Sequence, residues 1–393
     1  MNKIADLLNL KHLSHTLPKE FKGFYNENKY RTSQDYLKVN THFEFITSTV
    51  DLLILLIFWF SGGFPYIDGI VRSLGVGTIL TGLLFIGLLM IAKLVISLPF
   101  SIYSTFVIEE KFGFNKTTPK LFITDLFKSV LLSIVLGGIF LSAILSFLEY
   151  GGPNAWIMCW TASAVFLIAV QYIVPTWIMP LFNKFNPLPK GDLKTAIMTY
   201  ADAINFSISN IFVMDGSKRS SKSNAFFTGV GKNKRIVLFD TLVKEHTIEE
   251  LVSILAHEMG HYKKKHLLKR RVLEFIQMGV IFYLISVFIT HEGLFNAFSI
   301  TEPSIYTGLI FFGMLYSPID LLLSMLLQMS SRKDEYQADD FAKNSIKDSK
   351  PLITALKKLS VQNLSNLTPH PFYVFLNYSH PPVLNRIRIL ETT

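Results

Sequence analysis

Residues 76–107 read VGTILTGLLFIGLLMIAKLVISLPFSIYSTFV, and Lys93 carries the only charge in this stretch. A helix needs about 20 predominantly apolar residues to cross the hydrocarbon core of a bilayer. Lipid offers the backbone no hydrogen-bond partner, so such a segment crosses the membrane as a helix that satisfies its own peptide groups. The stretch therefore predicts a membrane-spanning helix, and with it an integral-membrane fold.

Five further stretches have the same apolar character. They bring the number of predicted spanning helices to six, and they cover residues 45–66, 129–148, 150–183, 275–290 and 303–329. The fourth span in chain order contains Pro175 and Pro180, so we expect it to kink or to end there. Three charged side chains lie inside predicted spans. Asp51 and Lys93 are expected to face a polar cavity or to pair with neighbours, whereas Asp320, which follows Pro318 in the sixth span, is a stronger candidate for a functional role.

The composition of the whole chain agrees with a membrane protein. Of the 393 residues 50% are hydrophobic and only 17% are charged, and the mean hydropathy is +0.37. Soluble domains carry about 25% charged residues. The 22 glycines, 16 prolines and single cysteine exclude collagen-like, disordered and disulfide-rich proteins. Much of the chain is therefore expected to be solvated by lipid.

The formal net charge of +9 is distributed unevenly along the chain. Six crossings place four segments on one side of the membrane: 1–44, 108–128, 184–274 and 330–393. These segments hold 36 of the 38 lysines and arginines, and the positive-inside rule assigns that side to the cytoplasm. The charge thus indicates membrane orientation, and no nucleic-acid partner is expected.

Residues 184–268 are expected to form a compact α/β segment. The pattern predicts a helix over 193–205 and strands at 211–214, 224–228 and 235–239, the last two joined by a turn at 229–233. Residues 218–222, Lys-Arg-Ser-Ser-Lys, lack the Gly-rich context of a phosphate site and are expected to form a mobile, solvated loop.

A further helix is predicted over residues 248–266, with no break before the fifth span. It starts with a capping box, Thr247-Ile248-Glu249-Glu250, and contains His257-Glu258-Met259-Gly260-His261, an H-E-x-x-H sequence. Four residues turn a helix through about 400°, so the two histidines project from one face, one turn apart, and can bind one metal ion.

Zinc suits two imidazoles, and the adjacent Glu258 carboxylate can polarise a zinc-bound water. The alternative interpretation is a charged surface helix whose residues 261–266 form a polar end at the membrane interface. A catalytic zinc ion needs a third protein ligand and an open position. Glu335 is a candidate because it follows the sixth span directly, on the same side of the membrane. Asp334 is an alternative that points elsewhere on its helix, and Asp339 can accept the second ring N–H of a ligand histidine.

The ordered set of motifs resembles the type I CAAX prenyl proteases, a family of integral-membrane zinc metalloproteases. Besides residues 257–261, the similar segments are Glu109–Thr117, Pro180–Phe185, Ser223–Phe227, Glu335–Asp339 and Ser379–Pro382. They occur in the family's order and cover almost the whole chain. Family members usually have another spanning helix before the region that resembles residues 6–13, so we expect either a truncated start or a member without that helix.

The resemblance implies one zinc ion per chain, with ligands His257, His261 and Glu335 and with Glu258 as the general base. It further implies that His380 and Arg386 are donors near the active site, where an imidazole or guanidinium beside zinc would stabilise an oxyanion. By the same resemblance, Asn224–Thr228 would offer an edge strand to the substrate backbone, with Asn224, Ala225 and Phe226 binding the substrate.

The predicted fold class is a multi-span α-helical membrane protein with a zincin-like α/β catalytic insertion on the cytoplasmic side. The predicted segments are a cytoplasmic N-terminal part (1–44), four spanning helices with a cytoplasmic loop at 108–128 (45–183), the zincin-like part (184–268), spans five and six (269–329) and a cytoplasmic C-terminal part (330–393). The protein is expected in the inner membrane of a bacterium or in the endoplasmic reticulum of a eukaryote.

The leading functional hypothesis is a zinc-dependent endopeptidase that cleaves lipidated CAAX-type or other membrane-associated peptides. Two alternatives remain open at this point. One is a broader quality-control protease of membrane proteins. The other is a transporter or channel with a structural zinc site, although structural zinc normally has four protein ligands, commonly cysteines, and the only cysteine here lies in a span.

Overall fold

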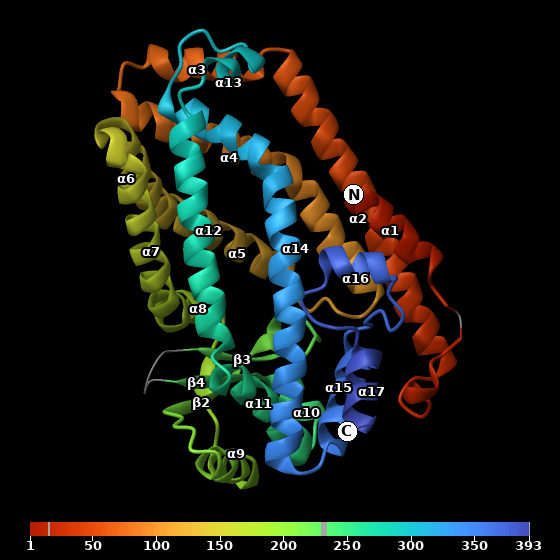
Figure 1. Ribbon diagram of the computed structural model, residues 1–393. Coiled ribbons are helices and arrows are strands. Elements are labelled where there is room, and N and C mark those ends of the chain that lie inside the picture. The colour runs from red at the N-terminus through yellow and green to blue at the C-terminus, as the bar shows by residue number, and fades with distance from the viewer. Residues whose placement is uncertain (15, 229–233, 393) are drawn as a thin grey trace.

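The computed structural model describes residues 1–14, 16–228 and 234–392 (Figure 1). Within these residues six helices are long and apolar enough to cross a membrane: Glu27–Phe60, Thr78–Glu109, Pro119–Tyr150, Gly152–Phe182, His266–Phe288 and Ile305–Ile346. Each predicted span overlaps one of them. The multi-span helical fold class is therefore confirmed.

Three of the long helices contain short π-helical stretches. The regular helices of the membrane part are α2 (Glu27–Phe60), α4 (Thr78–Tyr103), α5 (Pro119–Leu132), α6 (Gly138–Tyr150), α7 (Ala155–Ile173), α8 (Met179–Phe182), α12 (His266–Phe288) and α14 (Ile305–Ile346). π-Helical turns at Ser104–Glu109, Ser133–Gly137 and Val174–Ile178 extend α4, join α5 to α6 and join α7 to α8. The last of these contains Pro175, which lacks the N–H group of a regular helix, and α8 ends two residues after Pro180. The irregularity expected at the two prolines is present.

Two spanning helices extend well beyond the bilayer. α2 starts at Glu27, where the Asn26 side chain accepts a hydrogen bond from the Lys29 N–H at 2.7 Å, so the helix begins long before the predicted span at residue 45. α14 has 42 residues, which corresponds to about 63 Å, roughly twice the thickness of the hydrocarbon core. An apolar run marks only the part of a helix that lies in lipid, and α14 continues from there to the metal centre described below.

Two charged side chains of the membrane part pair with each other. Lys93 Nζ on α4 lies 2.6 Å from Asp51 Oδ1 on α2. Pairing reduces the cost of placing each charge among apolar side chains. Of the two expectations for these residues, pairing with a neighbour is the one that the structure contains.

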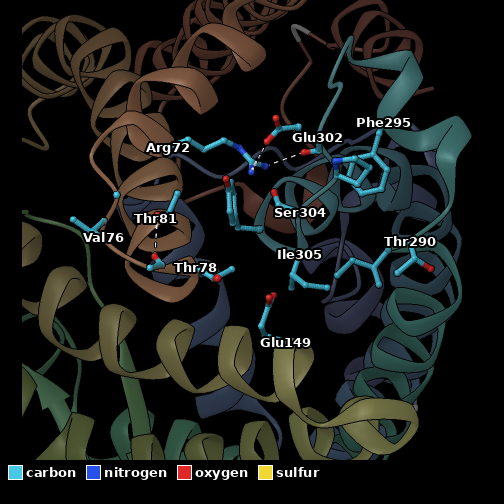
Figure 2. Close-up of a pocket in the computed structure, with 15 residues that line it drawn as sticks. Arg72, Val76, Thr78, Thr81, Glu149, Thr290, Phe295, Glu302, Ser304 and Ile305 are labelled. Atoms are coloured by element: carbon cyan, nitrogen blue, oxygen red, sulfur yellow. Dashed lines mark hydrogen bonds and ion pairs between the residues drawn. The ribbon is translucent and has the colours of Figure 1, made fainter.

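Two short helices lie at the end of the spanning helices that is far from the sheet, and these are α3 (Gly63–Ser73) and α13 (Glu292–Ala297) (Figure 1). A cavity of about 670 Å³ lies there between the starts of α4 and α14 (Figure 2). Arg72 donates to Asp68 Oδ2 at 2.8 Å and to the Glu302 carbonyl oxygen at 2.8 Å, and the Tyr306 hydroxyl donates to Asp68 Oδ1 at 2.6 Å. These contacts fasten α3 to the start of α14.

A four-stranded sheet lies at the other end of the spanning helices. Its strands are β1 (Phe185–Pro187), β2 (Asn210–Met214), β3 (Ala225–Thr228) and β4 (Arg235–Phe239), in the order β1-β2-β4-β3. β2 and β4 are parallel, and the two outer pairs are antiparallel. The three predicted strands are present within one residue of their predicted bounds. β1 was not predicted because it has only three residues, and the turn predicted at 229–233 lies outside the described residues.

The sheet packs against two helices, α9 (Asp192–Ala203) and α11 (Ile248–Lys263), and is followed by the short α10 (Asp240–Glu245). The buried core between them includes Ile197 from α9, Ile236 and Leu238 from β4, and Leu255 and Met259 from α11. The remaining helices are α1 (Asn2–Lys11), α15 (Lys350–Gln362), α16 (Pro371–Asn377) and α17 (Val383–Thr392). The α/β segment therefore has a hydrophobic core of its own, and one face of α11 belongs to it.

The expectation of a mobile, solvated loop at residues 218–222 is wrong. Arg219 Nε lies 2.7 Å from Asp125 Oδ2, and Lys222 Nζ lies 2.9 Å from Glu109 Oε2. The Arg219 carbonyl oxygen also accepts a hydrogen bond from the Lys116 N–H at 3.0 Å. The acidic partners are about a hundred residues away in sequence, so only the tertiary fold brings them to these basic side chains.

The helix predicted over 248–266 is also corrected. α11 ends at Lys263, and the N–H groups of Lys264 and Lys265 close its last turn by donating to the carbonyl oxygens of Gly260 and Tyr262. Lys265 adopts a left-handed conformation with φ 60° and ψ 26°, and α12 starts at the next residue. A single helix would have one axis; the break allows α11 to pack on the sheet while α12 follows its own direction into the membrane part.

Candidate metal centre

α11 is held in place from both ends. At its start the predicted capping box is present, since the Thr247 hydroxyl accepts from the Glu250 N–H at 3.3 Å and the Glu250 carboxylate accepts from the Thr247 N–H at 3.0 Å. Near its end Gly260 faces α14, where an added Cβ would lie 3.2 Å from both Cα and O of Ala338. This close approach places the histidine face of α11 directly opposite Glu335 on α14.

The two histidines and Glu335 converge on one point. The Nε2 atoms of His257 and His261 are 3.2 Å apart, and each lies 3.3 Å from a carboxylate oxygen of Glu335. Ligands about 2.0–2.1 Å from a tetrahedral zinc ion are separated by about 3.3 Å. The Glu335 Oε2 atom is buried and accepts no hydrogen bond in the described part of the chain, although His257 Nε2 and Arg386 Nη1 lie 3.3 and 3.5 Å from it. The spacing of the three side chains fits a zinc ion.

Asp339 and Arg386 lie behind His257. Asp339 Oδ1 is 2.8 Å from His257 Nδ1, and Arg386 donates from Nε and Nη2 to the two Asp339 oxygens at 2.8 and 2.6 Å. The carboxylate keeps a hydrogen on Nδ1, so Nε2 is the nitrogen available to a metal. Burial and the Arg386 charge lower the pKa of His257, but Asp339 and Glu335 outweigh them and raise it to about 9. A metal ion therefore has to displace a proton from this site.

His380 and Arg386 occupy different sides of the centre. The His380 side chain is 64% exposed, and its Nε2 lies 3.2 Å from Glu335 Oε1. The Arg386 guanidinium is buried, with two nitrogens on Asp339 and Nη1 at 3.5 Å from Glu335 Oε2. His380 thus borders the open side, whereas Arg386 is committed to the carboxylates.

Glu258 follows His257 on α11. Burial raises the pKa of its carboxyl group, and the neighbouring His257 and His261 oppose the shift. Its carboxylate has no hydrogen-bond or ion-pair partner among residues 1–14, 16–228 and 234–392. Such a group is free to exchange a proton with a bound molecule.

The residues singled out for substrate binding lie on the edge strand of the sheet. β3 pairs only with β4 among the described residues, so its other edge has no strand beside it. Asn224 precedes β3, and its side-chain oxygen accepts from the Ala225 N–H at 2.8 Å. Ala225 and Phe226 are the first two residues of the strand. The position at an edge agrees with what the resemblance implied.

Two residues near the centre were missed from the sequence. His266, expected only as part of a polar helix end, is buried and has its Nδ1 3.1 Å from His261 Nδ1. Gln337 Oε1 lies 3.0 Å from His266 Nε2. Asp334, the alternative third ligand, instead pairs with Lys269 at 2.8 Å. A third histidine close to the motif was a visible signal, but continuous helical geometry directed it away from His261.

Two family models match almost the whole chain. The one described as CAAX prenyl protease N-terminal, five membrane helices, matches residues 6–184, and the one described as Peptidase family M48 matches residues 187–393. The first match includes four of the six candidate spanning helices in the described part. Every residue of the metal centre lies in the second match.

Individual relatives and a solved structure are similar to the chain over most of its length and indicate the same family. CAAX prenyl protease 1 homolog of Oryza sativa subsp. japonica is 39% identical over 388 residues, which are 96% of this chain and 90% of the relative. CAAX prenyl protease 1 of Saccharomyces cerevisiae is 36% identical over an alignment of 406 residues, covering 95% of this chain and 88% of the relative. The crystal structure of S. mikatae Ste24p matches with a TM-score of 0.94 at 35% identity, covering 99% of this chain and 95% of that one. The chain is therefore an integral-membrane metalloendopeptidase that belongs to peptidase family M48, among the CAAX prenyl proteases.

Proposed function

We propose that this metalloendopeptidase uses zinc and removes C-terminal peptides from CAAX-type prenylated substrates. The observation that supports zinc is the set of 3.2, 3.3 and 3.3 Å distances among the ligand atoms of His257, His261 and Glu335. The substrate class is inferred from the relatives, which are named as CAAX prenyl proteases.

In the proposed reaction each residue of the centre has one task. A zinc ion held there would supply Lewis-acid chemistry, which polarises a carbonyl group and makes water more acidic. Glu258 accepts a proton from the attacking water and passes it to the amine that leaves when the peptide C–N bond breaks. His380 donates a hydrogen bond to the oxyanion that develops on the carbonyl oxygen. Arg386 holds Asp339, and Asp339 orients His257.

We propose further that β3 holds the substrate and that the centre faces the cytoplasm. An extended peptide can add to an open strand edge through main-chain hydrogen bonds, which would involve Asn224, Ala225 and Phe226. The lysines and arginines concentrated in residues 184–274 and 330–393 support a cytoplasmic orientation. The yeast and plant relatives come from eukaryotes, and of the two expected membranes this favours the endoplasmic reticulum.

The first experiment replaces the general base. In Glu258→Gln the zinc ligands are intact, so we expect the purified protein to keep one equivalent of zinc and to lose peptide cleavage, measured with a fluorogenic peptide and by metal analysis. Glu249→Gln is the matched control, since Glu249 lies on the same helix but is exposed in its first turn. Normal cleavage by Glu258→Gln would contradict the proposed mechanism.

The second experiment tests the substrate class. A farnesylated CAAX peptide is compared with its unlipidated form at equal concentration in the same detergent, and we expect faster turnover of the lipidated peptide. Equal kcat/KM for the two would argue against recognition of the lipid, and would favour the broader task of degrading membrane proteins.

A further inference from the structure

His266 lies behind His261, on the side away from the other ligands. Its Nδ1 is 3.1 Å from His261 Nδ1, its Nε2 is 3.0 Å from Gln337 Oε1, and 6% of the residue is exposed. From this geometry we infer that His266 is a positioning residue that selects the metal-binding tautomer of His261. The inference rests on the zinc centre proposed above. It adds to that centre a residue that is not itself a ligand.

The hydrogen-bond partners decide where each hydrogen lies. Gln337 Oε1 is an acceptor 3.0 Å from Nε2 of His266, so this nitrogen carries the hydrogen. In a neutral imidazole the other nitrogen then has a lone pair. Nδ1 of His266 therefore accepts, and Nδ1 of His261 donates. This leaves the lone pair of His261 Nε2 directed at the space shared with Glu335.

The opposite arrangement would remove a ligand. If His266 donated from Nδ1, His261 would have to accept there and would carry its hydrogen on Nε2. An N–H group would then point into the space between the ligand atoms, and a neutral imidazole binds a metal only through a nitrogen that carries a lone pair. The contact to Gln337 excludes this arrangement by keeping the hydrogen of His266 on Nε2.

Each ligand histidine thus has its own acceptor. Asp339 accepts from His257, and His266 accepts from His261. Asp339 is a carboxylate on α14, whereas His266 is a neutral ring at the first position of α12. Groups of this kind fix the tautomer and the ring orientation of a metal ligand, and their loss typically weakens metal binding 10–100-fold.

The break between α11 and α12 creates the contact. On a continuous helix a residue five positions after His261 would point about 140° away from it. The left-handed conformation of Lys265, at φ 60°, turns His266 back, so that the two rings meet edge to face with their centroids 5.2 Å apart. Left-handed backbone is unfavourable for a residue other than glycine. Strained backbone of this kind is concentrated at functional sites.

The test compares His266→Leu with His266→Asn in the purified full-length chain. Leucine fills much of the space without accepting a hydrogen bond, whereas asparagine presents an oxygen near the position of Nδ1. We expect the zinc affinity, measured by competition with a chromophoric chelator, to fall 10–100-fold in the leucine variant. The asparagine variant should stay within a few-fold of the native chain. Lys264→Gln is the control, because this neighbouring lysine is exposed and has an ordinary backbone conformation with φ −80°.

A second pair of variants keeps the test decisive if His266→Leu does not fold. Gln337→Met removes the acceptor for His266 and should weaken zinc binding, whereas Gln337→Glu retains an acceptor and should not. The Co²⁺-substituted protein should show a changed d–d spectrum in the leucine and methionine variants only.

Three outcomes would overturn this relay, in which Gln337 fixes the hydrogen of His266 and His266 thereby selects the tautomer of His261. They are unchanged zinc affinity in His266→Leu, equal losses in the leucine and asparagine variants, and unchanged affinity in Gln337→Met. A native chain that binds no zinc would overturn the proposed function and the relay together. Normal cleavage by Glu258→Gln would overturn the mechanism alone, because zinc affinity is measured without substrate.

Discussion

At the scale of single residues, the metal centre separates groups that face the substrate from groups that hold the ligands. His380 is exposed on the open side, close to Glu335. Arg386 is buried and uses two of its nitrogens on Asp339. The resemblance treated these two residues as equivalent donors. Their surroundings favour His380 for the oxyanion and give Arg386 a supporting position.

This division predicts different kinetic signatures. His380→Ala should lower kcat by about 10²–10³, the usual cost of removing one oxyanion donor, and should leave zinc affinity unchanged. Arg386→Gln should weaken zinc binding by about 10–100-fold, because Asp339 loses the group that orients it. Chelator competition and steady-state kinetics on both variants check this. Loss of zinc in His380→Ala, or a loss of kcat alone in Arg386→Gln, would contradict the division.

At the scale of elements, the crossing of α11 and α14 assembles the ligand set. α11 supplies two histidines and α14 supplies Glu335 and Asp339, so the centre exists only when these helices lie at the correct separation. Gly260 sets that separation, because the space for a side chain is already filled by Ala338 of α14. α14 is also continuous with a spanning helix, so it connects the centre rigidly to the membrane part.

Gly260→Val should therefore damage both stability and metal binding. The added carbons would meet Ala338 backbone atoms, and overpacking of this kind costs about 1–3 kcal/mol. We expect a lower melting temperature in detergent and weaker zinc binding in the same variant. Gly138→Ala serves as the control, since a Cβ there meets no atom within 4 Å. An unchanged zinc affinity in Gly260→Val would show that the helix separation does not matter.

At the scale of the whole molecule, the two ends of the spanning helices have separate tasks. The sheet, α11 and the C-terminal helices surround the metal centre at one end, and α3 and α13 lie at the other (Figure 1). At that far end Asp68 is buried and accepts from both Arg72 and Tyr306, whereas the Glu302 side chain is 75% exposed. One guanidinium thus has a buried partner and an exposed partner.

The two partners should differ in their contribution to stability. Asp68→Leu leaves Arg72 and the Tyr306 hydroxyl without their buried acceptor and should cost about 2–3 kcal/mol. Glu302→Gln should cost less than about 1 kcal/mol, because exposed ion pairs contribute little. Thermal unfolding in detergent measures both changes. Cleavage below the melting temperature should be normal in both variants, since the metal centre lies at the opposite end; a selective loss of kcat in Asp68→Leu would contradict this independence.

Local patterns in the sequence were sufficient for the six spans, for three of the four strands and for part of the centre. Apolar runs marked the six spans because lipid imposes a minimum length on any helix that crosses it. The spacing of His257 and His261 placed them on one face because helical geometry is the same in every protein. Asp339 was reached in the same way, from its four-residue spacing to Glu335.

Tertiary structure decided whatever depends on contacts between distant segments. The ion pairs of Arg219 with Asp125 and of Lys222 with Glu109 turned an expected loop into a fixed one. The left-handed Lys265 ended α11 and brought His266 onto His261. Periodicity records which face of one element is apolar. It carries no information on where two elements meet, or on which of the lysines 263–265 ends the helix. The sequence by itself therefore determined a six-span membrane protein with a metal-binding helix, and only the folded chain decided which side chains complete and orient the centre.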